Sequence, residues 1–339
     1  MLKKFLRGLA FVLAAVLAVW AVIAIFPRSY NYTPENPLRK DAELPLLIAH
    51  GGGNREFPDN TLEAFYNAYS VDPRVMMETD VSITKDGVVI LSHDTTLDRK
   101  TNVTGNISDW NYSDLIAQKV DFGYTNPTEN DRLSGQRKKF TTQEGKEVTP
   151  LDVEYPAGVT PRDETVFLAT TLEELMVSFP ESRINAEIKQ EGELGMRCLK
   201  AVLELVEKHN AWDRVVFASF HEELYDEFQR LQEAGEVPET FMCSPAYDGV
   251  TEFFVMQLLV ADVFFDDRMT VFQLPMEEYG IDLATKGMVD AAHKHNLAVH
   301  YWTINDPEEM KHLIEIGADG IMTDYPHRLK EVYDNWNGQ

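Results

Sequence analysis

The stretch LLIAHGGGNREFPDNTLEAFYNAYSVDPRVMMETDV, residues 46–81, contains two short apolar runs separated by a longer amphipathic segment. Each run has the length of a strand that is buried on both faces, and the segment between them is long enough for a helix. A strand, a helix and a second strand in this order form a βαβ unit, whose two strands pair in parallel. The stretch therefore predicts an α/β fold with a parallel sheet.

Apolar runs of the same kind recur along the chain, with helical patterns between them. They are LLIAH (46–50), VMMETDV (75–81), VVILSHD (88–94), RINAEIK (183–189), VVFASF (215–220), TFMCSP (240–245), ADVFF (261–265), LAVHYWTI (297–304) and GIMTD (320–324). A TIM-type (β/α)8 barrel has eight strands. Nine runs are one too many, and we expect residues 261–265 to lie outside the barrel. Residues 100–165 are polar and interrupt the alternation, which predicts an insertion after the third strand.

The N-terminus carries an apolar segment, GLAFVLAAVLAVWAVIAIF at residues 8–26, preceded by Lys3, Lys4 and Arg7. About 20 apolar residues cross a bilayer, so residues 1–28 are predicted to be one transmembrane helix that anchors the chain. A signal peptide has the same order of charges and remains an alternative. We expect a proline-containing tether at 29–45 and a barrel domain at 46–335, which includes the insertion 100–165. The positive-inside rule predicts a single-pass protein with its catalytic domain outside the cytoplasm, and this N-terminus would suit a bacterial plasma membrane.

The charge balance argues against one class of partner. The 339 residues include 31 Lys and Arg against 56 Asp and Glu, a formal net charge of −25. Such a chain repels a phosphate backbone, so nucleic acid is not expected as a partner. The two cysteines, Cys198 and Cys243, lack CxxC spacing and are expected to be buried thiols.

Polar side chains stand where several of the predicted strands end, and the C-terminal strand ends of a barrel are where active sites form. The candidates from this pattern are His50, Glu78, Asp80, His93, Glu187, Lys189 and Trp302. Glu78 and Asp80 are two residues apart, so on a strand both carboxylates point to one face. Adjacent buried carboxylates are unfavourable unless a cation compensates them. Three carboxylates favour Ca²⁺ or Mg²⁺ over Zn²⁺, although Lys189 could instead form a structural ion pair with one of them.

Taken in order, these motifs resemble the glycerophosphodiester phosphodiesterase family from about Leu46 to Tyr333. The resemblance is carried by AHGGGNREFPDNTLEAF (49–65), METDVSITKDGVVILSHDTTLDRKTN (77–102), NAEIK (185–189), SF (219–220), WTIN (302–305) and GADGIMTDYP (317–326). It implies a TIM-type barrel in which His50 and His93 act as the acid/base pair. It also implies one divalent cation on Glu78, Asp80 and Glu187. Lys189 would then face phosphate, and Trp302 would belong to the substrate site.

One position departs from the family pattern. The family usually has His-Arg-Gly at its first motif, with the arginine meeting phosphate, whereas this chain has His50, Gly51 and Gly52. Loss of a charged phosphate contact weakens binding and transition-state stabilisation. Arg55 and Arg99 are the candidates to replace it. A binding protein with weak catalysis is the alternative that this departure leaves open.

The resemblance predicts hydrolysis of glycerophosphodiesters to glycerol 3-phosphate and an alcohol. A lysophospholipase D activity on lysolipids is the alternative, because a membrane-anchored domain meets such substrates. The aromatic residues of the insertion would then form a wall for the acyl chain, or they could simply form the insertion's own small core. They are Trp110, Tyr112, Phe122 and Tyr124.

Overall fold

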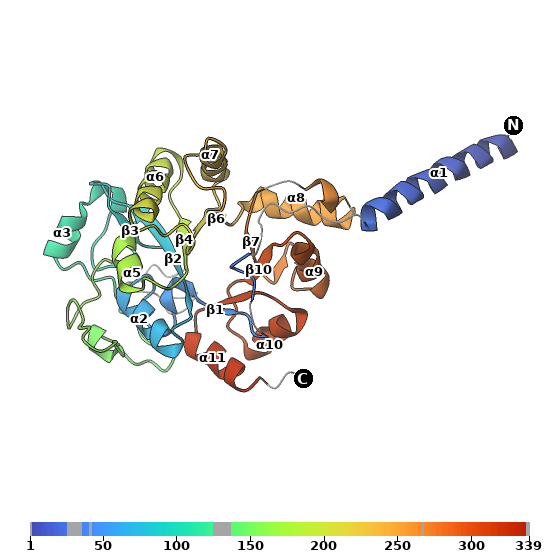
Figure 1. The fold of residues 1–339 in the computed structure, drawn as a ribbon. Coiled ribbons are helices and arrows are strands. Elements are labelled where there is room, and N and C mark those ends of the chain that lie inside the picture. Colours follow the sequence, from blue (N-terminus) through green and yellow to red (C-terminus); the bar gives the residue numbers. More distant parts are fainter. Residues whose placement is uncertain are drawn as a thin grey trace.

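The computed structural model describes residues 2–25, 36–40, 43–124, 137–259, 261–265 and 268–336. Among these residues, eight parallel strands form a nearly closed barrel with helices around it, and helix α1 extends away from the barrel (Figure 1). The α/β barrel that the sequence predicted is confirmed. The expected boundaries at residues 28 and 29 and most of the expected tether, residues 29–35 and 41–42, lie outside the described residues.

The barrel strands follow one another around the sheet in the order β6-β5-β4-β2-β1-β11-β10-β7. Their bounds are β1 Leu46–Ala49, β2 Met76–Ile83, β4 Ile184–Ile188, β5 Val215–Ala218, β6 Met242–Cys243, β7 Val271–Leu274, β10 Ala298–Tyr301 and β11 Gly320–Thr323. The two ends of this order, β6 and β7, are joined at their base, where the backbone N–H of Thr270 donates to the Cys243 carbonyl at 2.9 Å. No strand ladder pairs β6 with β7 among the described residues.

Helices lie around the barrel and pack apolar residues against the core, one of them within the insertion. They are α2 Leu62–Val71, α3 Tyr112–Ala117, α5 Leu172–Ser178, α6 Gly192–Lys208, α7 Glu222–Glu233, α8 Tyr247–Leu258, α9 Lys286–Lys294, α10 Pro307–Ile316 and α11 Pro326–Asp334. Local sequence explains where they begin. Thr61 caps α2 by accepting from the Ala64 N–H, and Thr171 and Glu174 form a capping box on α5.

The structure differs from the sequence prediction at two strands. Residues 88–94 contain β3 (Val89–Leu91), which pairs antiparallel with β2 and is not a barrel strand. The eighth place is taken by β7 at Val271–Leu274, which the apolar runs did not reveal. Residues 261–265 lie outside the barrel as expected, because Asp262–Phe264 form a turn of 3-10 helix. The insertion follows β3, and its residues 125–136 lie outside the described residues.

The barrel interior has an apolar lower layer and a polar upper layer. On β2 the two-residue repeat places Met76, Glu78 and Asp80 on the inward face. Met76 belongs to a buried cluster at the bottom of the barrel, together with Leu38, Ile48, Val216, Met242, Val271, Ala298 and Met322. The carboxylates therefore lie above an apolar floor, at the C-terminal ends of the strands.

Residues 36–40 contact the bottom of the barrel. Leu38 is fully buried in the lower layer, and its carbonyl accepts a hydrogen bond from His300 Nε2 at 3.0 Å. The Asn36 amide donates to the carbonyls of Thr270 and Asn296, both at 2.7 Å. The C-terminal part of the expected tether is thus packed as part of the domain.

Candidate active site

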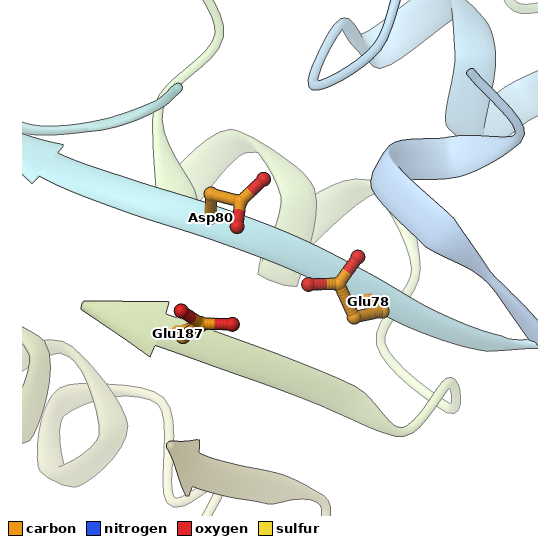
Figure 2. Close-up of side chains that lie close together, drawn as sticks. All are labelled: Glu78, Asp80 and Glu187. Atoms are coloured by element: carbon orange, nitrogen blue, oxygen red, sulfur yellow. The ribbon is translucent and has the colours of Figure 1, made fainter. Parts of the chain in front are cut away.

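Three carboxylates meet inside the upper layer of the barrel. Glu78 and Asp80 project from β2 and Glu187 projects from the adjacent β4, all toward one common space (Figure 2). Each offers an oxygen that lies within 4.8 Å of the others. Glu78 and Asp80 are buried, and Glu187 is largely buried. The structure thus brings together the three residues that the sequence nominated for a cation.

Hydrogen bonds from neighbouring loops fix the orientation of the two β2 carboxylates. Glu78 accepts from the backbone N–H of Gly51 at 2.8 Å. Asp80 accepts from the Asn60 amide at 2.9 Å, and the Asn60 oxygen in turn accepts from the backbone N–H of Asp80. Such outer contacts hold ligating carboxylates in place in metal sites. The sequence analysis missed Asn60, although it stands in the quoted PDNT motif.

Lys189 stands beside the cluster as its counter-charge. Its ammonium lies 2.9 Å from Asp80 Oδ1 and 2.5 Å from Glu187 Oε1. Burial lowers the pKa of Lys189, but the charges of Asp80 and Glu187 outweigh burial, so the lysine remains protonated. The ion pair that the sequence left open is therefore present, with two of the carboxylates.

The pKa values of the carboxylates reflect their burial and mutual repulsion. Burial and the charges of Asp80 and Glu187 raise the pKa of Glu78 to about 8. Burial also raises the pKa of Glu187, and Asp80 adds to this effect. The pKa of Asp80 is lowered despite burial, mainly by Lys189. One carboxylate is thus stabilised as the anion, while its two neighbours are held in an unfavourable environment that a positive charge would relieve.

His50 follows β1 and is held by Asp324, which follows β11. His50 Nδ1 lies 2.7 Å from Asp324 Oδ1, and Asp324 also accepts from the Asn305 amide at 2.7 Å. Burial lowers the pKa of His50, but the bond to Asp324 and the charges of Glu78, Asp324 and Asp80 overcome it and raise the pKa to about 10. With Nδ1–H directed at Asp324, Nε2 is left for proton exchange.

His93 stands in a similar pair on the loop after β3. Its Nδ1 lies 3.0 Å from Asp94 Oδ1, and Arg99 donates to both Asp94 oxygens at 2.7 and 2.6 Å. Burial raises the pKa of Asp94, but the bonds from His93 and Arg99 outweigh it and hold the pKa far below its usual range. The electrostatic interaction of His93 also lowers the pKa values of Asp80 and Glu187, after the larger effects of burial and of Lys189.

The loop after β1 explains why glycine suits the first motif. Gly51 has φ +54°, and Gly52 has φ +84° with its Cα so near α2 that a Cβ would lie 2.8 Å from the Cβ of Ala64. Arg55, further along this loop, has its Nε 3.7 Å from Asp324 Oδ2. Arg99 is bound to Asp94. Burial lowers the pKa of Arg99, but Asp94, Asp59 and Asp80 outweigh burial and raise it. Both arginines thus lie around the histidine and carboxylate cluster.

Trp302, the last of the predicted substrate residues, follows β10 and lines a cavity of about 410 Å³ that also reaches Glu187. The centroid of its ring lies 6.1 Å from that of Phe220. The insertion aromatics are elsewhere. Phe122 is buried, Trp110 and Tyr112 pack against the main core, and none of these three or Tyr124 is among the described residues that line the cavity.

Comparison with known proteins assigns the family. Residues 50–328 match the model of the Glycerophosphoryl diester phosphodiesterase family. The chain belongs to this family. It is 27% identical to mouse lysophospholipase D GDPD1 over 320 residues, which is 88% of this chain and 89% of that protein. It is 25% identical to a glycerophosphodiester phosphodiesterase of Bacillus altitudinis, over 85% of this chain and 98% of that protein.

Solved structures of family members share the fold. The glycerophosphoryl diester phosphodiesterase domain of a Mycobacterium tuberculosis protein superposes with a TM-score of 0.64 at 18% identity, covering 85% of this chain and 98% of that one. An Oleispira antarctica phosphodiesterase in complex with the product sn-glycerol-3-phosphate gives 0.59 at 20% identity, covering 86% and 98%. At these identities the likeness establishes the barrel. The chain is therefore a glycerophosphodiester phosphodiesterase family enzyme built on a TIM barrel.

Proposed function

We propose that this enzyme hydrolyses glycerophosphodiesters to glycerol 3-phosphate and an alcohol, with one divalent cation and two histidines. The observation that carries the proposal is the arrangement of two Asp-His pairs near three buried carboxylates. The named activities of the family relatives and the glycerol 3-phosphate bound to one of them support the substrate class.

The donor set fits a hard cation. All three candidate ligands are carboxylates, their oxygens lie within 4.8 Å of one another, and the site is largely buried. The charges of Asp80 and Glu187 raise the pKa of Glu78, so a positive charge among them would be stabilising. Glu78, Asp80 and Glu187 would hold Ca²⁺ or Mg²⁺. When bound, the ion would neutralise charge on the phosphoryl oxygens and acidify a neighbouring hydroxyl.

The chain's own residues would handle the protons and the phosphate charge. Asp324 and Asp94 each accept from the Nδ1 of one histidine, which leaves the Nε2 of His50 and of His93 for the substrate. One histidine takes a proton from the attacking oxygen and the other gives a proton to the departing alcohol. Lys189, Arg55 and Arg99 would supply the positive charge that Gly51 cannot.

The test uses the full chain in lipid nanodiscs. Glycerol 3-phosphate release from glycerophosphocholine is measured after chelation and again with Ca²⁺ or Mg²⁺ restored. We expect release only with a cation, and expect His50→Ala and His93→Ala to abolish turnover while cation affinity stays close to that of the wild type. Wild-type rates in either variant would refute the assignment of that histidine. The KM values of Arg55→Gln and Arg99→Gln are also compared, because loss of the arginine that contacts phosphate should raise KM.

We further propose that α1 (Leu2–Ile25) anchors the enzyme in the plasma membrane with the barrel on the outer side. Residues Lys3–Val22 are long and apolar enough to cross a bilayer and are not buried in the protein. The basic residues before the apolar segment support this orientation. Protease added to intact cells should digest the barrel. Protection from protease in intact cells would contradict the orientation, and loss of α1 from the mature chain would favour the cleaved signal.

A lysolipid substrate is the second candidate. The relative lysophospholipase D GDPD1 acts by its name on lysophospholipids, and the cavity beside Glu187 and Trp302 is an observation of this chain that favours the same class.

A further inference from the structure

A cavity of about 410 Å³ lies among residues that end or follow β6 and β7, two strands that form no ladder with each other. Its walls come from the segments that follow β5, β6 and β7, from α8, and from the two-stranded hairpin β8–β9 (Glu277–Glu278 and Ile281–Asp282). The cavity therefore lies where the two end strands of the sheet come together. Pockets of this size bind small organic molecules or portions of larger ones.

The walls of the cavity are apolar. Helix α8 contributes Tyr247, Val250, Thr251 and Phe254, a spacing of three and four residues that places them on one face of the helix. Leucines, prolines and aromatic rings supply much of the remainder. Among the described residues that line the cavity, Glu187 and Glu278 are the charged ones, and Glu278 accepts a hydrogen bond from Tyr247. Such walls favour a hydrocarbon occupant over a charged one.

The cavity is continuous with the proposed catalytic site. Glu187, a proposed cation ligand, and Trp302 both line it. Phe220 stands at this junction, because its ring faces Trp302 and also lies 5.8 Å from the Lys189 ammonium. A substrate whose phosphate lies at Lys189 can thus extend past Phe220 into the apolar space.

The outer part of the cavity is open to amphiphiles. Tyr279, at the turn of the hairpin, is 84% exposed although it lines the cavity, and Phe220 is 53% exposed. Exposed aromatic side chains around an apolar entrance are typical of sites that receive ligands. A hydrocarbon chain that enters here meets these aromatic rings, beside Glu278 of the hairpin.

We propose that this cavity binds the hydrocarbon tail of a single-chain glycerophosphodiester, which makes lysophospholipids the substrate class. The inference rests on the proposed phosphodiesterase function and specifies its substrate. For lysophosphatidylcholine, water adds its oxygen to phosphorus and the P–O bond to choline breaks. The choline oxygen takes a proton, and the products are lysophosphatidate and choline. The tail-binding wall is formed by α8 and the hairpin, not by the aromatic residues of the insertion.

The experiment compares choline release from glycerophosphocholine and from octanoyl, decanoyl and dodecanoyl lysophosphatidylcholine. The full chain is held in nanodiscs of a dialkyl phosphatidylcholine, and kcat/KM is measured. Val250→Trp fills the cavity. Val255→Trp is the matched control, because Val255 lies on the same helix but is exposed outside the cavity. Tyr279→Glu, a change at an exposed position, serves as a second variant in case Val250→Trp does not fold.

We expect kcat/KM in the wild type to rise at least roughly tenfold from the tail-free to the decanoyl substrate, because buried methylenes favour binding. Val250→Trp and Tyr279→Glu should remove most of that gain and leave glycerophosphocholine turnover within about twofold, whereas Val255→Trp should change neither. The substrates partition into the same nanodiscs in both assays, so substrate partitioning does not distinguish the two tryptophan variants. Equal rates for all tails, or equal losses in Val250→Trp and Val255→Trp, would overturn the proposal.

A binding measurement separates this inference from the catalytic proposal. Decylphosphocholine below its micelle concentration should bind the chelated wild type and the Val255→Trp variant, and bind Val250→Trp at least about fivefold more weakly. If wild-type enzyme bound decylphosphocholine in this manner but released no choline from any substrate, the catalytic proposal would fail and the tail site would stand. Binding that did not distinguish the two variants would refute the tail site itself.

Discussion

Replacing Lys189 by methionine tests whether the carboxylate cluster is built for a cation. The ammonium lies 2.9 Å from Asp80 and 2.5 Å from Glu187. Each contact is worth about 6 kcal/mol of gross attraction at an effective dielectric constant of about 20. Breaking a buried pair typically lowers the free energy of unfolding by about 3–5 kcal/mol, because the partner charges stay buried. Since the lysine side chain is 18% exposed, we expect about 3 kcal/mol.

A divalent cation should reverse much of this loss. It would supply the positive charge that the variant lacks, and at a hundred times its Kd it stabilises the folded state by about 2.7 kcal/mol. The wild type should gain less from the same cation, because Lys189 repels the ion. In thermal unfolding, Lys189→Met should lower the Tm by about 6–10 °C in chelator and recover most of it when Ca²⁺ or Mg²⁺ is added.

The control is Lys119→Met. Lys119 makes an equally short pair with Asp163, at 2.6 Å, but its side chain is 67% exposed. An exposed pair contributes less than about 1 kcal/mol, so this variant should show a small shift that no cation restores. If Lys189→Met were no less stable than Lys119→Met, the buried ion pair would not contribute the expected stability. If added cation left the Tm of Lys189→Met unchanged, the cation site would be refuted.

Three further predictions concern the neighbouring residues. Asp324→Asn should reduce kcat about 100-fold or more with little change in KM, because the amide cannot hold His50 in the same tautomer; an unchanged kcat would exclude a positioning role for Asp324. Gly52→Ala should destabilise the protein by about 1–3 kcal/mol more than Gly87→Ala in urea unfolding. Both glycines have φ near +85°, but a Cβ at Gly52 would lie 2.8 Å from the Cβ of Ala64, whereas a Cβ at Gly87 meets nothing within 4 Å. Burial raises the pKa of Asp319, but the bond from His293 at 2.7 Å and further donors lower it overall. The stability that this carboxylate contributes should therefore be present above about pH 4 and lost as pH falls through its folded pKa, so wild type and Asp319→Asn should converge in acid unfolding.

The barrel was predictable because its strands are buried on both faces, which leaves an unmistakable alternation of apolar runs with helical segments. The sequence pattern does not show whether a strand pairs parallel or antiparallel with its neighbour. The run at 88–94 has the composition of a barrel strand, yet its VIL core pairs antiparallel with β2. Strand β7 escaped notice because Gln273 interrupts its apolar pattern, and the structure explains this residue by its hydrogen bond to Asn185 inside the barrel.

For the site too, residues that follow a local sequence pattern could be predicted, whereas features built from distant segments could not. The two-residue spacing that nominated Glu78 and Asp80 also links Met322 to Asp324, so Asp324 could have been found by the same rule. The tail cavity could not, because its walls come from segments as far apart in the sequence as Phe220, Tyr279 and Trp302.

The glycine at the first motif is better understood as part of this arrangement than as a missing arginine. Gly51 adopts φ +54°, and a Cβ there would lie 3.0 Å from the Cβ of Asp59. Its N–H orients Glu78 through a contact that any residue in this conformation could make. A glycine makes that contact without strain, while Lys189, Arg55 and Arg99 bring three cations to the same region from other segments. Positive charge that is missing at one position is thus present at others, which supports the proposed phosphodiester site.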